Sequence, residues 1–272
     1  MAGHTAYVLH LADNALILGQ RNAQWCGLGP ALEEDIAMAN TSLDLIGQAR
    51  LLYQHAAVLL RQEPGGEVVS AVTEDTLAYF RDPHEFRNYT LLELPHFPSS
   101  TGLLGAAAQA APDYATTIVR NFLYSGLMLL VWQELQGSND TQLAAIAARS
   151  VKETRYHWRH SRDWLVRMGD GTDHSHTRVQ AALHQLLPYT QEFWSRSQLE
   201  VDAVAIGAGV DTARLQGEWD QNLDLALAEA CLSRPTVRGF VPQGKNGRHS
   251  EHLGYLLEHM QSLARRHPEA VW

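Results

Sequence analysis

The sequence predicts an all-α protein, and three observations lead to that class. No stretch alternates apolar and polar residues as a β-strand does. Several long segments instead place apolar residues three and four apart, and glycines, prolines and capping residues divide these segments into helix-sized lengths. With 272 residues, of which 45% are hydrophobic, the chain has enough apolar surface for a sizeable core, and we expect one helical domain over residues 1–272.

Two long helices are expected at the start of the chain. The first runs from about Thr5 to Trp25 and stops before Gly27, and the second runs from Pro30, a favourable first helical position, to about Arg61. The second helix has a polar row, made of Asn40, Asp44 and Gln48. The apolar row that we expect to face the core consists of Ile36, Leu43, Ile46 and Leu52.

The middle of the chain is expected to hold shorter elements. The stretches 63–67 and 96–112 are rich in Pro, Gly and small residues and are predicted loops. Between them we expect a short helix over Glu74–Phe80, a turn over 81–83, and a second short helix over Glu85–Glu93 that the following prolines end.

Five further helices complete the prediction. Asn139 is the predicted cap of the second of them, because Gln142 three residues later completes a capping box. The expected helices follow Pro112 to Gln136, Asn139 to Gly169, Ser175 to Trp194, Asp211 to Leu232, and Ser250 to His267.

The helix that ends at Gly169 carries an unusual inward stripe. Its members lie three and four residues apart and are Ile146, Ser150, Glu153, His157, His160 and Trp164. A core stripe that becomes acidic and basic in its middle is typical of ferritin-like bundles, in which glutamates and Glu-x-x-His motifs hold two metal ions. The sequence therefore predicts a ferritin-like helical bundle with additional helices, and the remaining ligands should be found in it.

The sequence does not supply a complete di-iron ligand set. Its one Glu-x-x-His, Glu93–His96, contains Pro95 and cannot lie on a regular helix. The acids and imidazole that remain near the expected centre are Asp13, Asp44, Glu153 and His157. We favour a metal-free polar cluster, in which these groups bond to one another and to nearby arginines (Arg50, Arg120 or Arg155), over a degenerate site that binds one metal ion weakly.

Other segments carry weaker signals. His249–His252 could be a metal or proton site, but an N-cap by Ser250 with an acid in the first turn is the simpler interpretation. Asp173–His176 is expected in a solvated turn. Gly244–Arg248 could hold a phosphate or be an exposed loop, and it matches no phosphate-loop pattern. Three tryptophans at helical spacing are expected in the core: Trp132, Trp158 and Trp164.

Composition argues against some partners and compartments. The net charge of −9 argues against nucleic acid as a partner. The most apolar run, Phe122–Trp132, is too short to cross a membrane, and the first residues, MAGHTAY, do not resemble a signal peptide. Cys26 and Cys231 form no disulfide framework, so we expect reduced thiols in a cytoplasmic protein.

Four segments resemble one known family. They are TAYVLHLADNALILGQRNAQWCG (5–27), LEEDIAMANTSLDLIGQAR (32–50), KETRYHWRHSRDWLVRMGDGTD (152–173) and GKNGRHSEHLGYLLEHMQSLARRHP (244–268). In order and spacing they are similar to the C subunits of bacterial phenylacetyl-CoA 1,2-epoxidases, and the similarity runs over nearly the whole chain.

The resemblance implies a role in phenylacetate catabolism, in a multicomponent oxygenase that forms the ring epoxide of phenylacetyl-CoA with O2. It implies a di-iron catalytic A subunit as partner, and further subunits that include an NADPH-dependent reductase. It implies that the C subunit has a similar fold without the iron ligands, so that this chain has no cofactor and no catalytic residue of its own.

The resemblance also implies that this chain contacts the acyl-CoA substrate. The matching residues are Glu85, Phe86, Arg87 and Asn88, together with Val201, Asp202 and Ala203. Two functions therefore stand: a non-catalytic structural and substrate-contacting subunit, or a self-sufficient ferritin-like metalloenzyme with a degenerate metal site.

Overall fold

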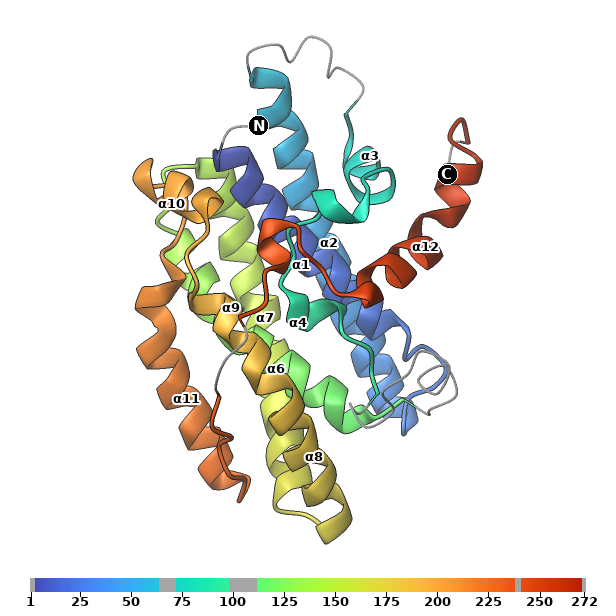
Figure 1. Ribbon diagram of the computed structural model, residues 1–272, viewed down its shortest axis with the longest axis vertical. Coiled ribbons are helices and arrows are strands. Elements are labelled where there is room, and N and C mark those ends of the chain that lie inside the picture. The colour runs from blue at the N-terminus through green and yellow to red at the C-terminus, as the bar shows by residue number, and fades with distance from the viewer. Residues whose placement is uncertain (1–2, 64–71, 98–111, 238–240, 271–272) are drawn as a thin grey trace.

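The structure is a computed structural model that describes residues 3–63, 72–97, 112–237 and 241–270 (Figure 1). Within these residues every regular element is a helix, and the one β-type contact is an isolated bridge between Gln243 and Arg248. The all-α prediction is therefore confirmed. Most of the two predicted loops, 63–67 and 96–112, lies outside the described residues, and the single-domain prediction stays a prediction.

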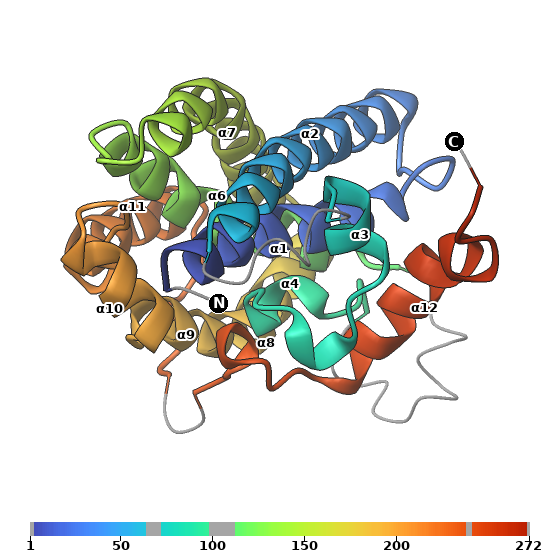
Figure 2. The same cartoon turned by 90° about the horizontal axis from the view of Figure 1, so that it is seen from above.

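Two helix pairs form the bundle. α1 (Gly3–Ala23) packs along α2 (Leu32–Gln62), and α6 (Tyr114–Leu135) packs along α7 (Thr141–Gly169). Figure 2 shows α2 and α7 along one face of the molecule, with α4, α9 and α12 towards the opposite face. This paired arrangement agrees with the ferritin-like bundle with additional helices that the sequence predicts.

α6 is the most buried of the four bundle helices. Its length and composition would allow it to cross a membrane, but 89% of its most apolar window is buried inside the molecule, as in the core helix of a bundle. Trp132 of α6 is 1% exposed, and Trp158 and Trp164 of α7 pack partly buried against the core. The tryptophans are thus core residues, as expected.

The inward face of α2 differs from the predicted one. Ile36 and Leu43 are 52% and 67% exposed, whereas Leu45 and Leu52 are buried. The reason is a close approach between α1 and α2 at Gly19, where an added Cβ would lie 3.3 Å from the Cβ of Leu45. The face of α2 that carries Leu45 therefore meets α1, and the predicted apolar row turns partly to solvent.

The helix expected over Glu85–Glu93 is not formed as a unit. A 3₁₀ turn, η2 (Pro83–Glu85), is followed by extended backbone and by a single turn, α4 (Thr90–Glu93). The N–H groups of Arg87 and Tyr89 donate to the side chains of Asp13 and Asn14, at 2.8 Å each. Because these α1 side chains replace the helical acceptors, the segment stays extended across α1.

The helix expected over Ser175–Trp194 is divided. α8 (Asp173–Leu186) is followed by the 3₁₀ turn η4 (Leu187–Thr190), which contains Pro188, and by α9 (Gln191–Trp194). Proline lacks the N–H that would continue α8. The solvated turn expected at Asp173–His176 is instead the first turn of α8.

The remaining elements complete the cover of the bundle. One of them, α10 (Gln198–Ala205), was not expected from the sequence; a capping box between Ser197 and Glu200 starts it. The cap of α7 is Asp140 rather than Asn139, whose amide donates to the carbonyl of Ile206. The other elements are α3 (Glu74–Tyr79), η5 (Thr212–Leu215), α11 (Gln216–Glu229), η6 (Gly244–Asn246) and α12 (Glu251–Arg266).

Candidate functional site

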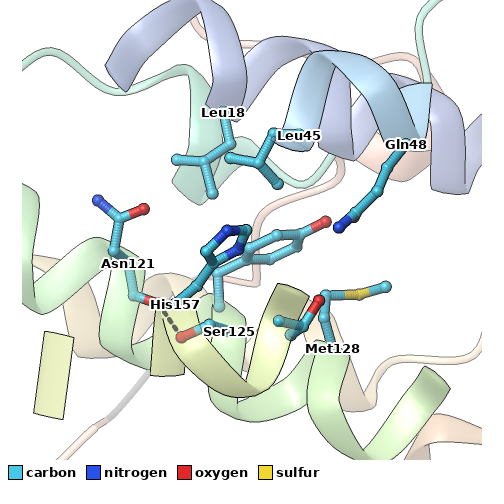
Figure 3. A pocket seen from close by; sticks show the side chains of 9 residues that line it. Leu18, Leu45, Gln48, Asn121, Ser125, Met128 and His157 are labelled. Atoms are coloured by element: carbon cyan, nitrogen blue, oxygen red, sulfur yellow. Dashed lines mark hydrogen bonds between the residues drawn. The ribbon is translucent and has the colours of Figure 1, made fainter. Parts of the chain in front are cut away.

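The centre of the bundle is a small cavity between α1, α2, α6 and α7, lined by both polar and apolar side chains. Its volume of about 10 Å³ is close to the room that one water molecule needs. Figure 3 shows Gln48 of α2, His157 of α7 and Ser125 of α6 around it. The full lining is Leu18, Leu45, Gln48, Asn121, Tyr124, Ser125, Met128, Thr154 and His157.

Of the four residues of the predicted degenerate cluster, His157 lines this cavity, and Asp44 and Glu153 lie beside it, where α2 faces α7. The imidazole of His157 lies 3.0 Å from a carboxylate oxygen of Asp44, whose side chain is 38% exposed. The amide of Gln48 donates to Glu153 at 2.9 Å, and Arg149 on the same helix donates to Glu153 at 3.3 Å. The acids are therefore held by an imidazole, an amide and a guanidinium.

The side chains that α6 offers to this centre are neutral. The side-chain amide of Asn121 exchanges hydrogen bonds with that of Asn22 at 2.8 and 3.1 Å. The Ser125 hydroxyl donates to the backbone carbonyl of Asn121 at 2.5 Å. A di-iron site needs carboxylates from both helix pairs to bridge and neutralise two cations. The donor set present does not fit such a centre.

Asp13 does not join the cluster in which the sequence placed it. It accepts hydrogen bonds from the Tyr53 hydroxyl at 2.6 Å and from the Arg81 guanidinium, which forms a buried ion pair with it. Burial by itself would lower the pKa of Arg81, but the Asp13 carboxylate outweighs that effect and raises it. Arg81, rather than the arginines named from the sequence, keeps this charge paired.

The first predicted substrate-contacting segment lies on α1. The side chains of Phe86 and Asn88 are both 0% exposed, and the Asn88 amide donates to Glu93 at 3.0 Å. Glu85 is exposed and Arg87 is half-buried, with its guanidinium bonded to the carbonyls of His84 and Phe86. Of the four residues, Glu85 and Arg87 are the ones whose side chains reach the surface.

The second predicted segment lies on α10. Val201 is 46% exposed, Asp202 is half-buried and Ala203 is buried. Val201 lines a surface cavity of about 310 Å³ with Arg196 and Arg214 at its side. These two guanidiniums share the carboxylate of Asp211, at 2.7 and 3.5 Å, and both arginines are largely exposed.

The weaker candidates from the sequence take part in buried ion pairs. Lys245, in the loop considered for phosphate, is 1% exposed and lies 2.7 Å from Glu200, so it is neither an exposed loop cation nor free for an anion. His249 contacts Glu93 at 2.8 Å. Ser250 occupies the N-cap position of α12 without a capping hydrogen bond from its side chain.

Sequence reasoning missed these ion pairs because their partners are far apart in the chain. Arg81 and Asp13 are separated by 68 residues, and His249 and Glu93 by 156. Helical spacing reports only on neighbours within a few turns. Such pairs have no local signal in a single sequence.

The comparisons with known proteins agree with the resemblance seen in the sequence. The model of the family "Phenylacetic acid catabolic protein" matches residues 2–272. The chain is also 38% identical over 268 residues to the C subunit of the 1,2-phenylacetyl-CoA epoxidase of Escherichia coli (strain K12), and the match covers 98% of each protein.

Proposed function

Because the chain belongs to the family of phenylacetic acid catabolic proteins, we propose that it is the C subunit of a phenylacetyl-CoA 1,2-epoxidase. In this role it catalyses no step alone, pairs with a di-iron A subunit and contributes to the binding of the acyl-CoA. The observation that supports the non-catalytic role is the bundle centre, whose polar lining, among the described residues, includes the neutral side chains of Gln48, Asn121 and Ser125 and no carboxylate.

Iron in this account belongs to the partner. Near the centre of this chain His157 contacts Asp44, and Glu153 is already bonded to Gln48 and Arg149. When bound in the partner, the di-iron centre supplies the activation of O2, and an NADPH-dependent reductase supplies electrons. This chain contributes a surface that contacts the A subunit and the substrate. We place the complex in the cytoplasm, where the exposed Cys26 and Cys231 stay reduced.

A candidate surface for the A subunit runs along α2. Leu32, Ile36 and Leu43 are 73%, 52% and 67% exposed and lie on one side of the helix; we call them the α2 stripe. Tyr156 of α7, 42% exposed, stacks on His160, which lies 3.0 Å from Glu34 of α2. Exposed apolar side chains grouped in this way are typical of protein interfaces. An interface of obligate size, over ~2,000 Å² in total, is expected.

Substrate contact in this account falls on the surface groups of the two segments. Coenzyme A carries phosphates, and a guanidinium binds a phosphate through two donors. Arg87 offers such a group in the first segment, and Arg196 and Arg214 offer two beside Val201. Phe86 and Asn88 are buried, so in this account they support the segment from the core, Asn88 through its hydrogen bond to Glu93.

Co-expression with a di-iron A subunit tests the proposal. We expect the two chains to elute together at micromolar concentration, and we expect epoxidation of phenylacetyl-CoA to require both chains and the reductase. Separate elution, or equal activity without this chain, would contradict the proposal. Turnover by this chain with the reductase alone would favour the self-sufficient metalloenzyme.

A further inference from the structure

Two imidazoles and a carboxylate converge at one end of the bundle, away from its centre. His4 lies in the first turn of α1, His55 lies near the end of α2, and Asp140 caps α7. The Nε2 atoms of His4 and His55 lie 2.8 and 2.5 Å from the same oxygen, Oδ2 of Asp140. The three atoms all lie within 4.8 Å of one another, so three groups that bind metals meet at a single point.

The carboxylate in this cluster is held in a fixed orientation. Oδ1 of Asp140 accepts a hydrogen bond from the N–H of Leu143 at 3.0 Å, as the cap of α7, and this turns Oδ2 towards the imidazoles. An ionised carboxylate with one oxygen bonded to the protein and one aimed at a shared point is how metal ligands are usually supported.

Burial and access both suit a bound ion. The side chains of His55 and Asp140 are each 8% exposed, and that of His4 is 21% exposed, so the point where they meet is mostly enclosed with one side open to solvent. Two imidazole nitrogens and one carboxylate oxygen are a donor set for zinc and related divalent ions. Zinc bonds of about 2.0–2.1 Å place neighbouring ligand atoms roughly 3.3 Å apart. A small increase in the distances between the two imidazole nitrogens and Oδ2 of Asp140 would therefore make room for the ion.

We propose that His4, His55 and Asp140 form a site for one divalent transition-metal ion, with Zn²⁺ as the preferred ion. The ligands are Nε2 of each histidine and Oδ2 of the aspartate, and water takes the fourth position. Asp44 and His55 lie three turns apart on α2, about 16 Å along its axis, so this site is separate from the bundle centre. The ion would join the ends of three helices, and the proposal does not depend on the proposed function.

Metal titration of the full chain, free of any affinity tag and stripped with a chelator, tests the site. Zn²⁺ is followed by calorimetry, and Co²⁺ by the visible absorption of a four-coordinate ion. We expect one ion per chain and a Zn²⁺-dependent rise in Tm of about 3 °C or more. His55→Ala and His4→Gln should each weaken Zn²⁺ binding by at least about tenfold.

Two comparisons separate a metal site from a hydrogen-bonded cluster. His4→Gln keeps a side-chain N–H for Asp140, so its metal-free Tm should match that of the wild type while its Zn²⁺ affinity falls. His184→Ala, at an exposed position on α8, is the matched control and should bind Zn²⁺ as the wild type does. Equal Zn²⁺ affinity in the wild type, His4→Gln and His55→Ala would overturn the proposal, as would a folded wild-type chain that binds no Zn²⁺.

Discussion

The two sides of the molecule use their polar groups differently. On the face crossed by α4 and α12, carboxylates are kept and paired with cations: Asp13 with Arg81, Glu93 with His249, and Glu200 with Lys245. Beside the face formed by α2 and α7, the polar side chains that line the centre are amides, hydroxyls and one imidazole, and Asp44 lies partly in solvent. The first face pairs its carboxylates with cations, and the centre beside the second face does not offer the carboxylates from both helix pairs that a di-iron site needs.

The polar contacts on the two faces hold different elements together. The paired carboxylates hold the extended segments on the bundle: Glu93 accepts from Ser250 and Asn88, and Glu192 accepts from the N–H groups of Thr90 and Lys245. Between α2 and α7 the polar contacts instead run directly from helix to helix. They join His157 with Asp44, Gln48 with Glu153, and His160 with Glu34. The α2 stripe on that side is apolar and exposed, which fits a surface that another chain covers.

The largest expected effect separates the buried carboxylate of Asp13 from the partly exposed carboxylate of Asp44. Asp13→Ala leaves Arg81, whose side chain is 10% exposed, without its buried partner, and should lower the free energy of unfolding by about 3–5 kcal/mol. Asp44→Ala removes a pair whose acid is 38% exposed and should cost about 1 kcal/mol or less. Urea denaturation of the two variants measures both. Equal losses would erase the proposed difference between the faces.

The second prediction tests the α2 stripe. Leu43→Asp should raise the Kd for the A subunit at least tenfold, because it places a charge in an apolar interface, yet change the stability of the isolated chain by only about 0.5 kcal/mol. Leu225→Asp is the matched control, since Leu225 is 64% exposed on α11. Unaltered binding by Leu43→Asp, measured by calorimetry, would remove α2 from the interface.

The third prediction concerns Arg87, on the side of the molecule crossed by α4 and α12. Arg87→Ala should leave the complex intact and raise the KM for the acyl-CoA about tenfold, which corresponds to roughly 1.4 kcal/mol of uniform binding. Asn88 is left unchanged in this test, because its amide supports Glu93 in the core. Arg266→Ala, at an exposed position on α12, serves as control. A KM equal to that of the wild type would remove Arg87 from the substrate site.

The smallest expected effect is a pH dependence of stability that comes from His249. The two ring nitrogens of His249 face acceptors, the Glu93 carboxylate at 2.8 Å and the Phe86 carbonyl at 3.0 Å, so both nitrogens donate and the imidazole is charged. Burial would lower the pKa of His249, but these contacts outweigh it and raise that pKa. Its contribution to stability is therefore fully present below about pH 6.5 and is lost as the pH rises through the raised pKa.

The variant His249→Gln isolates this contribution. The stability difference between wild type and variant should be largest below pH 6.5 and shrink at higher pH, as measured by urea denaturation at several pH values. The comparison with the variant is needed because His96 changes stability with pH in the opposite direction. Burial lowers the pKa of His96, so its ring is neutral in the folded protein. A difference that grows with pH would show that His249 is not the charged partner of Glu93.

Local patterns in the sequence predict some of these features and not others. The inward stripe of α7 is predictable because helical spacing requires only neighbouring residues, and its centre, His157, is indeed buried. The extended course of residues 86–89 is not, because its N–H groups bond to α1 side chains more than 70 residues away. The cluster of His4, His55 and Asp140 escapes prediction for the same reason, since its members come from three separate helices.

The iron content of the isolated chain, after expression in iron-supplemented medium, tests the central claim most directly. It is measured by elemental analysis in the wild type and in His55→Ala, so that an ion held by His4, His55 and Asp140 is not counted as part of the bundle centre. The account predicts no stoichiometric iron in His55→Ala. Two irons per chain in both proteins would contradict it.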